Sequence, residues 1–72
     1  MTKQEKIRVI EEMMELGEGI LEEGTVLKDL EEWNSLAKLS LIAILDEQFG
    51  RKISADEIKA LKTVQDILQY ME

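Results

Sequence analysis

Residues 33–50 read WNSLAKLSLIAILDEQFG, and this stretch decides the fold. Its apolar residues recur at helical spacing, so the pattern predicts a helix from about residue 36 to residue 49. Ser35 stands at the helix start, where a hydroxyl can accept a hydrogen bond from an unpaired backbone N–H. The expected core stripe of this helix consists of Leu39, Ile42, Leu45 and Phe49.

A first helix is predicted over residues 3–16. Thr2 is its expected N-cap, and Gly17 is the expected glycine just past its end. Residues 17–34 then form a long acidic connection. Because this connection carries several apolar side chains, we expect it to pack against the helices; these residues are Ile20, Leu21, Val26, Leu27 and Leu30.

Two further helices are predicted towards the C-terminus. A capping box begins at Ser54 and starts a short helix over residues 55–61. Thr63 is the expected cap of a last helix over residues 64–71. The sequence therefore predicts one all-α domain over residues 1–72, a small bundle of three longer helices and a short third one with a long first loop.

The composition excludes several classes of function. The chain has no Cys and no His, which removes the thiol nucleophile and the commonest general base near neutral pH, so no enzyme activity and no catalytic residue is predicted. Residues 46–57 have the length of a calcium-binding loop, but Gly50 comes one position early, so no metal site is predicted either.

The charge and hydropathy patterns bear on the partners and the cellular location of the protein. A net charge of −7 disfavours nucleic acid and anionic lipid as partners. The longest apolar run, residues 41–45, is too short to insert into a membrane, and residues 1–6 do not lead into a signal peptide. We therefore expect a cytoplasmic monomer.

Several segments of the chain resemble acyl carrier proteins and related carrier domains. In that family an Asp-Ser-Leu signature is followed by a helix, an acidic stretch and Phe-Gly, and the serine carries 4′-phosphopantetheine. Here Ser35 and Gly50 stand at the family's separation. Further similar segments occur in the family's order at residues 26–30, 49–53 and 62–67, so the resemblance covers most of the chain.

The resemblance implies a free-standing carrier that holds acyl or aminoacyl groups as thioesters. Its 4′-phosphopantetheine would be attached at Ser35, with Asn34 and Leu36 beside it. The implied partners are a phosphopantetheinyl transferase, a loading ligase, and a downstream acyltransferase or synthase. The expected partner-binding residues are Trp33, Leu36, Leu41, Asp46 and Glu47.

The departures from the family pattern indicate a specialised role. Asn34 replaces the usual Asp, and the run resembles a bacterial Trp-(Asp/Asn)-Ser-Leu type of carrier from lipid or secondary-metabolite biosynthesis. Ala37 and Ser40 stand where the resemblance implies acidic, partner-facing residues in fatty-acid carriers, and Lys38 adds a positive charge; this favours a dedicated set of partners. The alternative is a carrier-fold interaction or regulatory module that is not phosphopantetheinylated.

Overall fold

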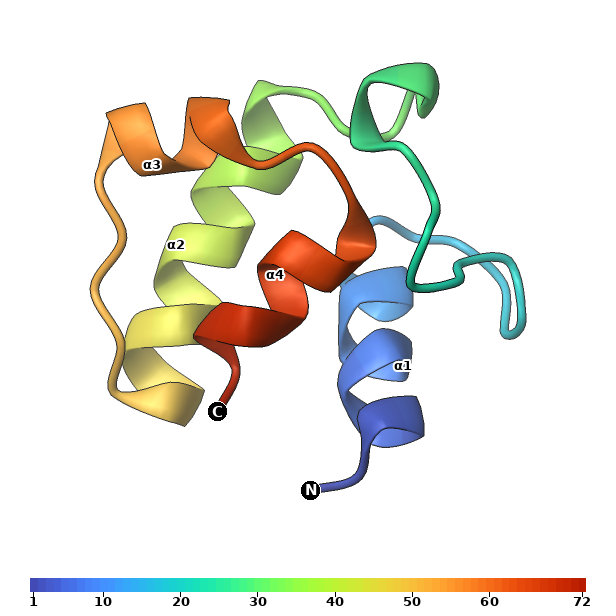
Figure 1. The fold of residues 1–72 in the computed structure, drawn as a ribbon, viewed down its shortest axis with the longest axis horizontal. Helices are drawn as coiled ribbons and strands as arrows, with labels where there is room; N and C mark the ends of the chain where they lie inside the picture. Colours follow the sequence, from blue (N-terminus) through green and yellow to red (C-terminus); the bar gives the residue numbers. More distant parts are fainter.

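The computed structural model describes residues 1–72 and confirms the all-helical fold. Its four helices are α1 (Lys3–Met13), α2 (Ser35–Phe49), α3 (Ala55–Ala60) and α4 (Val64–Tyr70), with a 3₁₀ turn at Leu27–Asp29. Helix α1 packs against α2 and α4, and the short α3 lies across the end of the bundle at which α2 begins (Figure 1). No helix has the length and apolar character needed to cross a membrane.

One hydrophobic core joins all four helices and the long loop. Ile10, Leu27, Leu41, Leu45 and Ile67 are among its fully enclosed side chains. Half-buried side chains, including Trp33, Ile42 and Phe49, cover the core from outside. The last two helices and the residues directly after them contribute six buried side chains, namely Ile58, Leu61, Val64, Ile67, Leu68 and Met71.

Helix α2 presents a different face to the core from the predicted one. Its buried residues are Ala37, Leu41 and Leu45, whereas Leu39 is 64% exposed. The predicted stripe is therefore wrong at Leu39 and right at Leu45. The reason is that α2 is apolar on nearly all sides, so helical periodicity alone does not select the face that packs against its neighbours.

Helix α1 ends three residues earlier than predicted. Thr2 is its N-cap, as expected, and forms a capping box with Glu5. At the other end the chain turns at Met14 and Glu15, and Glu15 rather than Gly17 adopts the left-handed conformation with φ 60°. The backbone N–H of Leu16 then donates to the carbonyl of Glu11 at 2.8 Å, which closes the turn.

The long loop between α1 and α2 packs against the bundle, as expected. Leu21 and Leu27 are buried, although Ile20 is 57% exposed. Backbone hydrogen bonds join the loop to the α3–α4 connection: the N–H of Leu27 donates to the carbonyl of Lys62 at 2.9 Å, and the N–H of Val64 donates to the carbonyl of Thr25 at 3.1 Å. The loop is thereby held against the connection between α3 and α4.

The N-terminal ends of the last two helices are fixed by local hydrogen bonds. Ser54 and Glu57 form the predicted capping box of α3. Before α4, the carboxylate of Asp66 accepts from the backbone N–H of Thr63 at 3.1 Å and from that of Lys62 at 2.8 Å. Both helices end one residue before their predicted ends, at Ala60 and Tyr70.

Candidate attachment site

Asn34 is the N-cap of helix α2, so Ser35 is the first helical residue and not the cap. The Asn34 side-chain oxygen Oδ1 accepts a hydrogen bond from the backbone N–H of Ala37 at 3.0 Å. Ser35 itself is exposed, and its hydroxyl takes part in no side-chain hydrogen bond of the structure. The capping task that a serine usually performs at a helix start is therefore taken by its neighbour.

The first turn of α2 leaves backbone donors free beside the Ser35 hydroxyl. The backbone N–H groups of Ser35 and Leu36 have no acceptor within the chain, because the capping oxygen of Asn34 serves only Ala37. No acidic side chain lies in this first turn. Free N–H groups at the positive end of a 15-residue helix favour an anion, and a phosphate is the anion that such sites commonly bind.

An exposed apolar surface continues from Ser35 along α2. Leu36 is 73% exposed and Leu39 is exposed on the following turn. Asp46 and Glu47 are also exposed near the far end of the same helix. The structure thus leaves Ser35, Leu36, Asp46 and Glu47 exposed on one helix.

Two residues expected on that surface lie in the core instead. Leu41 is fully buried, so its side chain is not available to a partner, in contrast to its predicted role. Ala37 is also buried, and it therefore does not occupy an outward place. Leu39 is the accessible residue that the sequence analysis missed. Its spacing of three from Leu36 is the signal that could have placed both on one face.

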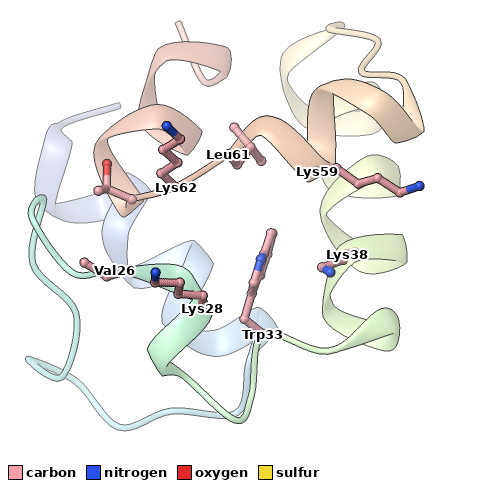
Figure 2. A pocket seen from close by; sticks show the side chains of 8 residues that line it. Val26, Lys28, Trp33, Lys38, Lys59, Leu61 and Lys62 are labelled. Atoms are coloured by element: carbon pink, nitrogen blue, oxygen red, sulfur yellow. The ribbon is translucent and has the colours of Figure 1, made fainter.

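A hollow of about 810 Å³ lies between the start of α2, the 3₁₀ turn and the segment from α3 to α4. The Trp33 indole projects into it, and the Lys38 amine lies 5.9 Å from the centre of the indole ring (Figure 2). Trp33 is half-buried and packs against the core. The hollow is lined by Val26, Lys28, Trp33, Lys38, Lys59, Leu61, Lys62 and Thr63.

The carboxylates with perturbed pKa values lie away from Ser35 and stabilise the fold. Burial alone raises the pKa of Glu11, which is 2% exposed, but hydrogen bonds from the Leu21 N–H and the Arg8 guanidinium outweigh it and lower that pKa. A hydrogen bond to Glu57 raises the pKa of Tyr70. Glu11 therefore has a structural role that the sequence analysis missed, because no local pattern of residues marks its hydrogen bond to the loop.

Acidic residues do not gather into a metal site. The chain contains no group of three or more His, Cys, Asp or Glu side chains placed to hold a metal ion. Asp46 instead lies 3.9 Å from the Lys52 amine in an exposed ion pair. The start of α2 offers one exposed hydroxyl, the free backbone donors beside it and the apolar surface next to them.

Comparison with known proteins gives one curated relative. The chain is 39% identical over 54 residues to an acyl carrier protein of Thermosynechococcus vestitus, a match that covers 75% of this chain and 65% of the relative. The chain thus spans slightly under two thirds of that relative's length. No family model matches, and no solved structure matches. The all-helical bundle of the chain agrees with this similarity.

Proposed function

We propose that the chain is an acyl carrier protein with 4′-phosphopantetheine attached at Ser35. It would hold acyl or aminoacyl groups as thioesters and present them to partner enzymes, and it would not be an enzyme itself. The observation that carries the proposal is the exposed Ser35 hydroxyl at the first position of α2, released from capping by Asn34. The relative's name, acyl carrier protein, supports the same function.

The residues around Ser35 fit a phosphodiester. The free N–H groups of Ser35 and Leu36 and the positive end of α2 would bind the phosphate. When bound, the group supplies the thiol that the chain lacks, since the sequence contains no Cys. Leu36, directly beside the attachment point, offers an apolar contact to an enzyme that approaches Ser35.

The test is the intact mass of the protein after incubation with coenzyme A, Mg²⁺ and a broad-specificity phosphopantetheinyl transferase. We expect the mass of a single prosthetic group to be added, and we expect Ser35→Ala to abolish the addition. Ser40→Ala is the matched control, because Ser40 lies on the same helix but is half-buried one turn further on.

Two outcomes would overturn the assignment. Persistent modification of Ser35→Ala would place the attachment elsewhere in the chain. No modification of the unaltered protein by several transferases, with a standard carrier modified in parallel, would favour the alternative of an unmodified interaction or regulatory module. Asn34, which replaces the family's usual Asp, is the feature that favours this alternative.

The proposed partners are a phosphopantetheinyl transferase, a loading ligase and a downstream acyltransferase or synthase of a specialised pathway. The exposed part of α2 supports this proposal, because it presents Leu36, Leu39 and Ala43 before any acidic residue is reached at Asp46. A partner that binds this surface needs apolar contacts near Ser35 and basic groups only near the far end. A cytoplasmic location and a monomeric state stay predictions.

A further inference from the structure

The hollow around Trp33 is strongly basic in an otherwise acidic protein. Four of the chain's nine basic side chains line it, while the chain as a whole has a net charge of −7. No acidic side chain is among the lining residues. The four lysines come from separate segments, namely the 3₁₀ turn, α2, α3 and the α3–α4 connection; they are Lys28, Lys38, Lys59 and Lys62.

None of these four lysines is neutralised within the chain. The ion pairs of the structure involve Lys3, Arg8 and Lys52 only. Four positive charges around one hollow repel one another, and an anion placed between them would remove that repulsion. The unpaired lysines therefore point to an anionic ligand.

The hollow also offers apolar contact and enough room for a small organic group. The Trp33 indole stands within it beside Leu61, and Lys38 lies over the face of the ring (Figure 2). Its volume of about 810 Å³ is within the range of small-molecule sites. In Figure 2 Lys59 and Lys62 extend outward from the rim, and their flexible stems allow the amines to turn towards an anion.

The hollow lies close to the attachment residue. Trp33 is two residues before Ser35, and Lys38 is one helical turn after it, with its backbone N–H bonded to the carbonyl of Asn34 at 3.0 Å. A group tethered at Ser35 therefore reaches the rim of the hollow without crossing the bundle.

We propose that the hollow binds an anionic group on the carried cargo, so that the cargo is an acyl group with a second, free carboxylate. This inference rests on the proposed carrier function. It assigns Lys38 and Lys59, from α2 and α3, as the principal anion-binding side chains, with Lys28 and Lys62 adding to the positive potential. Neutral acyl groups of the same size would gain only the apolar contact with Trp33 and Leu61.

The test compares two acylated phosphopantetheine arms on Ser35 that differ only in the charge of the acyl group. A transferase loads Ser35 with amide-linked coenzyme A analogues that end in a succinyl group or in the uncharged succinamide, and the unacylated arm gives the baseline. Trp33 is the sole tryptophan, so its indole N–H gives a single NMR signal from inside the hollow. We expect the succinyl arm to shift this signal more than the succinamide arm, because an exposed ion pair favours the bound state of the arm by roughly two- to fivefold in its equilibrium constant.

Paired variants show whether the hollow is responsible. The double variant Lys38→Gln with Lys59→Gln should bring the two arms to the same response. The control Lys6→Gln with Lys52→Gln removes the same charge outside the hollow and should keep the difference. Added salt should reduce the difference in the unaltered protein, because the anion-binding side chains are accessible to solvent.

The design separates this inference from the carrier function. If the mass shows that Ser35 is not modified, the carrier proposal fails, and the same two arms are then attached by thiol chemistry to Ser35→Cys, the only cysteine in that variant. Equal responses to the charged and uncharged arms, by either route of attachment, overturn the inference. A difference that survives in the Lys38/Lys59 double variant overturns it as well.

Discussion

Asn34 and Ser35 divide two tasks at the start of α2. Asn34 satisfies the Ala37 N–H, and Ser35 keeps an exposed hydroxyl beside two free backbone donors. If Ser35 also capped the helix, its hydroxyl oxygen would accept a hydrogen bond from the backbone. That hydrogen bond would have to break before the hydroxyl could be modified. We therefore expect the identity of residue 34 to affect both helix stability and the modification of Ser35.

Asn34→Asp should keep the fold and speed modification of Ser35. Asp caps helices as well as Asn does, and its charge interacts favourably with the positive helix end, so stability should stay equal or rise by about 0.3–1 kcal/mol. The added carboxylate would lie next to Ser35, where it would help the transferase to hold the metal ion that assists transfer of the phosphopantetheine group. Chemical denaturation and transferase rates measure the two effects.

Asn34→Ala is the control for this comparison. It removes the capping oxygen, so it should cost about 0.5–2 kcal/mol of stability and bring no gain in rate. A rate for Asn34→Asp equal to or below that of the unaltered protein would mean that the transferase does not use a carboxylate at this position.

At the scale of elements, the long loop depends on one buried carboxylate. Glu11 on α1 accepts from the Leu21 N–H at 2.9 Å and from the Arg8 guanidinium at 3.3 Å. These hydrogen bonds favour the charged carboxylate, so the pKa of Glu11 is lower in the folded protein than in the unfolded chain. The resulting stabilisation is present above the unfolded pKa and is lost as pH falls through the folded one.

Glu11→Gln should therefore destabilise the protein most at neutral pH. We expect a loss of about 1–3 kcal/mol there, because a charged, buried acceptor is replaced by a neutral one. The difference from the unaltered protein should shrink below about pH 4, where carboxylates of the unfolded chain protonate. Denaturation across a pH series measures it, with the exposed Glu12→Gln as the matched control. A difference independent of pH would show that the charge of Glu11 does not matter.

A second prediction at the scale of elements concerns the exposed surface of α2. Because its turns next to Ser35 carry no acidic residue, fatty-acid synthase enzymes that bind an acidic carrier helix should use the modified protein poorly. Adding Ser40→Glu and Ala43→Glu should improve use at low salt, and the gain should fall as salt rises. Ala37 is excluded from this design because a charge there would enter the core.

The measurement is an elongation assay with these enzymes. If the unaltered protein already works as well as an ordinary fatty-acid carrier and the double change brings no gain, the proposal of dedicated partners fails.

At the scale of the whole molecule, one small core holds all the elements together. Leu45 lies fully enclosed in it, whereas Phe49 covers it from a half-buried position and Leu39 faces outward. A domain of this size has a free energy of unfolding of only about 4–11 kcal/mol, by the usual range per residue. Single core positions therefore carry a large share of its stability.

Leu45→Ala should cost about 2–5 kcal/mol, since the side chain is replaced by a cavity. Phe49→Ala should cost less than Leu45→Ala, and Leu39→Ala should stay within about 0.5 kcal/mol of the unaltered protein, as exposed positions usually do. Chemical denaturation of the three variants tests the order. A larger loss at Leu39 than at Leu45 would mean that the opposite face of α2 is buried.

The sequence by itself determined the features that depend on neighbours a few residues apart. Thr2 and Ser54 cap their helices through groups three residues away, and Gly50 ends α2 with φ 63°, a conformation in which glycine carries no steric cost. The exposed serine at the start of α2 follows from the same local pattern. The number, order and approximate limits of the helices could therefore be predicted.

Only the tertiary structure decided which surfaces meet. Helix α2 is apolar on nearly all sides, so packing against α1 and the rest of the core selected Leu41 for burial and left Leu39 accessible. The hydrogen bond from the Leu21 N–H to the Glu11 carboxylate joins groups ten residues apart, and the basic hollow gathers lysines from four segments. Such contacts depend on how the chain closes its loops and buries its total apolar surface, and no short pattern of residues encodes that choice.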